Sequence, residues 1–177
     1  MDERQCGGLF HEDPQTAEDR DIYLVRDGRD AVVSHARLRA SSLEAGRRGD
    51  PAMFETLLRE EITRPYLDGQ PSSGTWGGNV LSWLSAAGAP LAVLKYEDLI
   101  ADPRGSAQRV ISSLLPELVP IADVSIPSFQ ELHNLDPSFF RRGTAGAYRT
   151  EMSSELHELF WAQPDNATAM RQLGYHQ

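Results

Sequence analysis

The chain of 177 residues, of which 40% are hydrophobic and 24% charged, is long enough for one folded domain with a real core and short for two. Its net charge of −9 excludes broad electrostatic binding to nucleic acids or to anionic membranes. We therefore predict a single globular domain over residues 1–177, with no nucleic-acid or membrane partner, in which a local cluster of basic residues holds any anionic ligand.

The cysteine count and the length of the apolar runs limit the compartments in which the protein is expected. Cys6 is the only cysteine, so no disulfide can form within the chain, which favours a reducing compartment. No apolar run reaches the roughly 20 residues that span a bilayer, and the first residues lack the basic-then-apolar order of a signal peptide. Metal-ligand spacings are absent. We expect a cytoplasmic protein without a metal.

Strands and helices alternate along the chain. Residues 22–26 (IYLVR) are predicted to form a buried strand, followed by a turn at Asp27 and Gly28 and a helix from about Arg29. A second strand is predicted at 91–95 (LAVLK), and further helices begin at Pro51, Trp76, Pro103 and about Ser153. This order is typical of an α/β domain with a parallel sheet, although two or three strands fall short of the usual four or so.

Arg26 and Ser34 form the first part of a candidate site. In parallel sheets, ligands bind at the carboxyl ends of strands, where helix N-termini offer free N–H groups. Arg26 ends the first predicted strand, and Ser34 lies one to two turns into the next helix and faces back toward it. A guanidinium fork and a hydroxyl suit a phosphate. The alternative is structural: Arg26 pairs with Asp27 or Asp30, and Ser34 bonds within its helix.

The stretch 141–149 (RRGTAGAYR) forms the second part. Two adjacent arginines precede Gly143, and Gly146 adds flexibility three residues later. Such loops present backbone N–H groups and guanidinium forks to an anion. The alternative is an exposed basic turn.

Five stretches resemble, in this order, the PAPS-dependent sulfotransferases of the cytosolic and bacterial type: YLVRDGRDAVVSHARL, WGGNVLSW, VLKYEDLIADP, SFQEL and FFRRGTAGAYR. The resemblance covers roughly residues 9–175, and five ordered motifs are far more specific than one. It implies a three-layer α/β fold, a parallel sheet with flanking helices, related to the P-loop NTPases. It also implies PAPS (3′-phosphoadenosine 5′-phosphosulfate) as the sulfate donor and PAP as the product.

The resemblance assigns phosphate-binding roles to five residues. Arg26 and Ser34 match the pair that binds the 3′-phosphate of the nucleotide. The triplet that closes over the same phosphate is matched by Arg141, Arg142 and Gly143.

Two aromatic residues match the adenine site of the family. Tyr96, in the YED motif, matches a tyrosine beside the base, and Phe129, in SFQEL, matches an aromatic ring that packs on it. Gly146 completes the arginine-loop motif. Tyr148 stands where the family more often has tryptophan, and we expect it to keep an aromatic packing role.

The general base of the family is a histidine in a K-[ST]-H sequence ahead of the first strand. His11 lies fifteen residues before Arg26, but Leu9 and Phe10 replace the lysine and the hydroxyl residue. A neutral imidazole there could take the proton of an attacking hydroxyl. The alternative is a surface histidine in a polar turn. The other histidines are expected to be structural or exposed: His35, His133, His157 and His176.

One family element has no counterpart in the sequence, namely the strand and P-K-x-G-T-x-W loop that hold the 5′-phosphosulfate. Residues 71–76 (PSSGTW) have a similar sequence, but they lack the lysine and follow a predicted helix instead of a strand. We expect the fold to lack its first strand and this loop, which would leave an apolar sheet edge exposed. The chain should then be poorly soluble alone or pair that edge with a second copy, as a homodimer.

Three functions follow from these patterns. The first is transfer of a sulfuryl group from PAPS to a hydroxyl or amine of a small-molecule acceptor, with His11 as base. The second is a non-catalytic or fragmentary remnant that still binds 3′-phosphoadenosine nucleotides. The third and weakest is a small-molecule kinase of P-loop ancestry. Acceptor contacts are expected from variable loops at 40–75 and 116–128.

Overall fold

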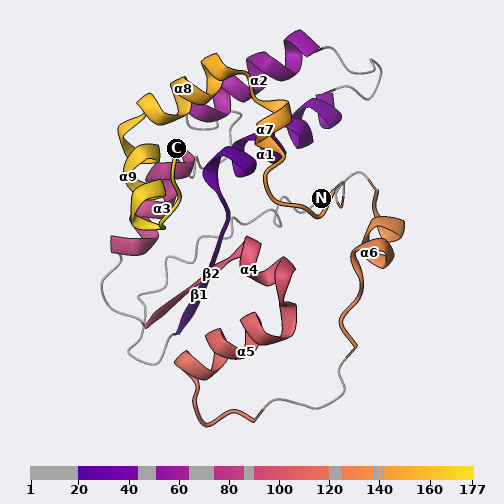
Figure 1. Ribbon diagram of the computed structural model, residues 1–177, viewed down its shortest axis with the longest axis vertical. Helices are drawn as coiled ribbons and strands as arrows, with labels where there is room; N and C mark the ends of the chain where they lie inside the picture. Colours follow the sequence, from indigo (N-terminus) through magenta and orange to yellow (C-terminus); the bar gives the residue numbers. More distant parts are fainter. Residues whose placement is uncertain are drawn as a thin grey trace, which may run out of the picture.

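The computed structural model describes residues 20–43, 51–63, 74–85, 90–119, 125–137, 140 and 142–177. Along the chain its elements are β1 (Asp21–Val25), α1 (Gly28–Leu43), α2 (Pro51–Thr63), α3 (Trp76–Ser85), β2 (Leu91–Lys95), α4 (Tyr96–Ala101), α5 (Pro103–Leu114), α6 (Phe129–Leu135), α7 (Tyr148–Glu151), α8 (Ser154–Ala162) and α9 (Pro164–Gln172). Helices predominate around a small parallel sheet (Figure 1), which confirms the α/β class.

The two strands run side by side in a register that pairs Asp21 with Leu91 and Val25 with Lys95. Parallel strands need a long crossover connection, and here it carries α1, α2 and α3. Because Val25 and Lys95 are partners, the residues that follow them leave the sheet at the same edge. The fold therefore brings the predicted ends of the two strands together.

The two faces of β1 differ in their packing. The Tyr23 ring stacks on Trp83 of α3 at 5.3 Å between centroids, and its hydroxyl donates to Asn79 Oδ1 at 2.9 Å. Ile22 and Leu24 point the other way and are 50% and 52% exposed. Among the described residues β1 pairs only with β2, so a larger sheet stays a prediction, and so does pairing with a second copy.

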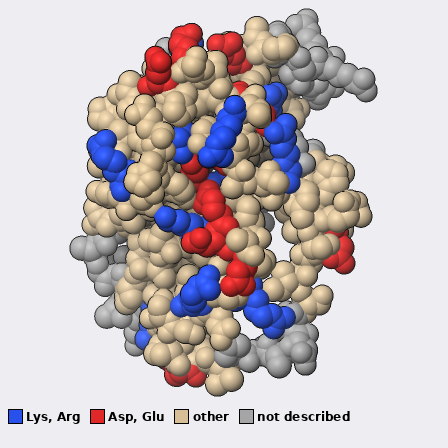
Figure 2. Space-filling model, in the orientation of Figure 1, with Lys and Arg blue, Asp and Glu red and all other residues tan. Residues whose placement is uncertain are grey.

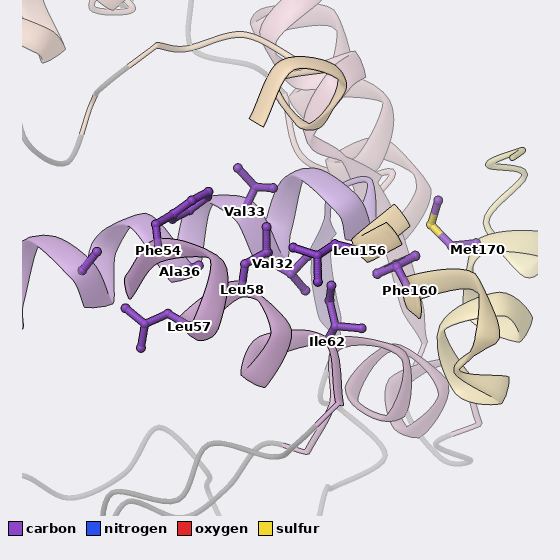
Figure 3. Close-up of a cluster of buried hydrophobic side chains, with 11 residues drawn as sticks. Val32, Val33, Ala36, Phe54, Leu57, Leu58, Ile62, Leu156, Phe160 and Met170 are labelled. Carbon is purple, nitrogen blue, oxygen red and sulfur yellow. The ribbon is translucent and has the colours of Figure 1, made fainter. Parts of the chain in front are cut away.

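The main hydrophobic core lies between α1, α2, α8 and α9. In Figure 3 the side chains of Val32, Leu58 and Leu156 come together between these helices. Its members from α1 recur at helical spacing, which explains why this polar-looking helix has one buried face. The cluster consists of Val32, Val33, Ala36, Ala40, Phe54, Leu57, Leu58, Ile62, Leu156, Phe160 and Met170.

The predicted strands and long helices are confirmed to within about a residue at their starts, whereas three short helices were not predicted. The helices α4, α6 and α7 have six, seven and four residues, too few for an apolar period to show. The first of them follows β2 with no break at all. A capping box marks the start of α6, since Ser128 and Glu131 each accept a hydrogen bond from the backbone N–H of the other.

Candidate functional site

A cavity of about 1050 Å³ opens between α1, α4, α6 and the segment that leads into α7. Figure 2 shows basic side chains over α1 and α7 and a hollow between this region and α6. All the sequence-predicted site residues that the structure describes line it: Arg26, Ser34, Tyr96, Phe129, Arg142 and Gly143. The other two, His11 and Arg141, lie outside the described residues.

Arg26 stands where β1 ends, at the edge of the sheet. Its Nη2 donates to the carbonyl oxygen of Thr144 at 2.9 Å and to Asp30 Oδ2 at 3.3 Å, and the guanidinium lies over the Tyr96 ring, 4.6 Å from its centroid. The Nε atom is buried and has no hydrogen-bond partner among the described residues. Leaving a buried charged donor unpaired is costly, so this arrangement fits a ligand that brings an acceptor.

Asp30 ties the arginine-rich segment to α1. Its side chain is fully buried and accepts backbone N–H groups from Gly146 at 2.6 Å and from Tyr148 at 2.9 Å. The ion pair of Arg26 with Asp30, predicted as the structural alternative, is therefore present within the same cavity wall. From the sequence, Asp30 was considered only as an alternative partner of Arg26, because its two backbone partners lie more than 110 residues further along the chain.

Gly143 and Gly146 allow this segment to follow its path, because both have positive φ angles, of 59° and 85°. At Gly143 a Cβ atom would overlap the Phe129 ring. The backbone of the arginine-rich segment thus rests directly on the aromatic residue at the start of α6. A glycine there lets loop and ring form one continuous wall.

The charge around the cavity is locally positive although the chain carries a net charge of −9. Of the described charged side chains that line it, Arg26, Arg37 and Arg142 are basic and only Asp30 is acidic, His35 aside. Arg37 was not predicted as a site residue. It lies three residues after Ser34, a spacing that places both on one face of a helix and could have revealed it.

Two further motif residues, Glu97 and Arg29, have structural roles. Glu97, of the YED motif, accepts the backbone N–H of Asp27 at 3.0 Å and the hydroxyl of Tyr175 at 2.7 Å. Burial and the hydrogen bond to Glu97 raise the pKa of Tyr175. Glu97 therefore joins the end of β1 to the C-terminal segment, beside the cavity.

Arg29 is the second motif residue with a structural role. It makes two side-chain hydrogen bonds to Asp27, at 3.0 and 2.7 Å, and lies over the Tyr148 ring, 4.1 Å from its centroid. Burial opposes its charge, but the hydrogen bonding and charge of Asp27 prevail and raise its pKa. Tyr148 has the aromatic packing role that we expected.

Of the described histidines, two have structural contacts, one lines the cavity and one is exposed. His133 bonds to the carbonyl oxygen of Phe140 through Nδ1 at 2.7 Å, and His157 packs parallel to the Tyr148 ring. His35, by contrast, lines the cavity and contacts Glu61 at 2.6 Å. Burial alone would raise the pKa of Glu61, but the hydrogen bonds from His35 and Arg39 lower it. His176 is exposed.

The described residues of the PSSGTW stretch stabilise the start of α3 and the core. Thr75 Oγ1 accepts the backbone N–H of Gly78 at 3.1 Å at the start of α3, and Trp76 packs against Phe160. Neither residue lines the cavity. Residues 71–73 lie outside the described residues.

Arginine forks, a serine hydroxyl and aromatic faces lie around one cavity, and these are the groups that can hold an anion and a flat ring system. A family model described as a sulfotransferase domain matches residues 16–169, and the chain belongs to this sulfotransferase family. A comparison with curated proteins gives no match. Sulfuryl transfer is therefore the general chemistry of the domain.

Two further findings concern membranes and metals. In the described ranges, no helix has both the length and the apolar character that crossing a bilayer requires. The same ranges hold no group of three or more His, Cys, Asp or Glu side chains placed to bind a metal ion.

Proposed function

We propose that the protein transfers a sulfuryl group from PAPS to a hydroxyl or amine of a small-molecule acceptor. One observation carries this proposal. Residues from four separate motifs, predicted individually to contact the nucleotide, line one cavity of about 1050 Å³. That volume is at the upper end for small-molecule sites and leaves room for a donor and an acceptor together.

The donor is bound at its 3′-phosphate by Arg26, Ser34 and Arg142, with Arg141 completing the cluster. The unpaired Nε of Arg26 supports this assignment, since a phosphate oxygen would satisfy a donor that the described residues leave without a partner. Tyr96 and Phe129 flank the adenine. Tyr96 already carries the Arg26 guanidinium on its face, so phosphate and base sites are adjacent.

The reaction is an in-line displacement at sulfur. The acceptor oxygen or nitrogen forms a bond to sulfur while the bond between sulfur and the 5′-phosphate oxygen breaks, and the acceptor proton passes to His11. The acceptor contacts come from the variable segments predicted at 40–75 and 116–128. Ala40, Ser41, Ile126 and Pro127 belong to these segments and line the cavity.

The proposal extends to the wider architecture and setting. We propose that residues 1–177 form one domain with the three-layer, P-loop-related fold of the family. We also propose that the protein forms a homodimer. The proposal also takes the protein as cytoplasmic, with no nucleic-acid or membrane partner.

Calorimetry with PAP and 5′-AMP tests the nucleotide site, because these ligands differ only in the 3′-phosphate. PAP should bind more tightly than AMP, and Arg26→Ala should abolish the preference. Arg59→Ala serves as the matched control, because this exposed arginine of α2 pairs with Glu155 and does not line the cavity. Equal affinity for PAP and AMP in the unmodified protein would contradict the proposal.

Transfer of labelled sulfate from PAPS to a panel of phenols, alcohols and amines tests the catalytic step. Label in the acceptor that depends on His11 supports the proposal. Full activity in His11→Ala would remove that residue from the mechanism. Binding of PAP without transfer to any acceptor would instead favour the non-catalytic remnant.

A further inference from the structure

Arg37 lines the same cavity as Ser34, one turn further along α1. No motif of the sequence singled it out. Two direct contacts, with α2 and α7, fix its position, and a third, indirect one links it to the arginine-rich segment. The guanidinium is therefore held in a fixed position in the cavity wall.

The first two contacts hold the guanidinium itself. Its Cζ lies over the Phe54 ring of α2, 3.5 Å from the centroid, and its Nε donates to Glu151 Oε2 of α7 at 2.8 Å. Stacking on a ring fixes the plane of the group, and the hydrogen bond fixes its rotation. Neither contact uses the Nη1 or Nη2 groups, which are the forked end of the side chain.

The third contact is indirect and runs through Glu151. Its other oxygen, Oε1, pairs with Arg142 Nη1 at 3.0 Å, and its side chain is only 6% exposed. One carboxylate thus holds two cavity-lining arginines side by side, Arg37 from α1 and Arg142 from the arginine-rich segment. Two arginines against one carboxylate leave a net positive charge.

We propose that Arg37 is a further phosphate-binding residue of the nucleotide site, which contacts the 3′-phosphate together with Arg142, and that Glu151 positions the pair. This inference rests on the proposed function, because it takes the ligand to be a 3′-phosphorylated adenine nucleotide. Arg–carboxylate–Arg bridging sets both forks before the ligand arrives, so less ordering is required on binding. The competing view is that Arg37 only joins α1 to α2 and α7.

A ligand and mutation cycle separates the two views. The affinities of PAP and 5′-AMP are measured for the unmodified protein and for Arg37→Gln, and the ratio of the two dissociation constants is compared. Loss of a charge-assisted phosphate contact should reduce the preference for PAP by about tenfold or more, with little change for AMP. Glu151→Gln should reduce it by a smaller factor.

The controls distinguish this inference from the proposed function. Arg59→Gln removes an exposed arginine outside the cavity and should leave the ratio unchanged. Arg26→Ala reports on the proposed function itself. If Arg26→Ala abolishes the preference and Arg37→Gln does not alter it, the role of Arg37 is refuted while the function stands. If the unmodified protein shows no preference, both are refuted.

Loss of folding is the remaining complication, because Arg37 also packs on Phe54. Arg37→Lys keeps the charge and most of the packing but lacks the fork, and its thermal unfolding can be followed by circular dichroism. A folded Arg37→Lys protein with a reduced preference for PAP supports the inference. Equal weakening of PAP and AMP binding would indicate a structural role and overturn it.

Discussion

Replacing Gly143 by alanine should damage nucleotide binding through Phe129. A Cβ atom at this position would overlap Cδ2 and Cε2 of the Phe129 ring and lie 2.7 Å from its Cγ. Ordinary carbon–carbon contacts are about 3.5–4.0 Å, so the ring or the loop has to move by about 1 Å. Because we assign this ring to the adenine, the substitution should act on affinity without touching the ligand.

The size of the effect has two parts. The backbone at Gly143 has φ of +59°, which costs an alanine about 1–2 kcal/mol of stability. Loss of stacking on a base is worth about 1–3 kcal/mol, or roughly a fivefold to 150-fold rise in the dissociation constant for PAP. The first part lowers the free energy of unfolding, and the second is specific to the ligand.

Gly74→Ala is the matched control, because Gly74 has φ of +77° and an added Cβ there would meet no atom of the described residues within 4 Å. Urea unfolding should show a loss of about 1–2 kcal/mol in both variants, and calorimetry should show weaker PAP binding only in Gly143→Ala. Phe129→Leu, which leaves the glycine in place, should weaken PAP binding in the same range. Unchanged PAP affinity in Gly143→Ala, or an equal loss of PAP affinity in both glycine variants, would refute the reasoning.

Three further predictions concern Asp30, His157 and the hydrophobic core. Asp30→Asn removes a buried charge that holds Arg26 and two backbone N–H groups, so we expect a loss of about 3 kcal/mol in urea unfolding and weaker PAP binding; an unchanged unfolding midpoint would contradict this. Burial and the Arg29 charge lower the pKa of His157, so the folded protein favours its neutral form. The resulting stability is present at neutral pH and is lost as the pH falls below about 6.5, the pKa of histidine in the unfolded chain. His157→Gln should therefore show a smaller drop in unfolding free energy between neutral and mildly acidic pH, and an equal drop would refute this role. Phe160→Ala empties a fully buried core position and should cost about 3–5 kcal/mol, whereas Leu135→Ala, 80% exposed, should change little; equal effects would mean that the core is misplaced.

The sequence by itself determined the local structure and the family. Short apolar runs ending in a charge predicted β1 and β2, and proline and capping residues marked the starts of the longer helices, because these signals depend on neighbours within a few residues. Motif order was enough to predict that Arg26, Ser34, Tyr96, Phe129, Arg142 and Gly143 would gather around one cavity. The short helices carried too little pattern to be predicted, except that SFQEL contains the capping box of α6.

Only the tertiary structure decided how the site is held together. Asp30 bonds to Gly146 across 116 residues of sequence, and Glu97 bonds to Tyr175 across 78. Such partners depend on strand register and on helix packing, which no local pattern encodes. Helical spacing could place Arg37 on the same face of α1 as Ser34, but not beside Arg142, because that position depends on Glu151 of α7, which pairs with both arginines.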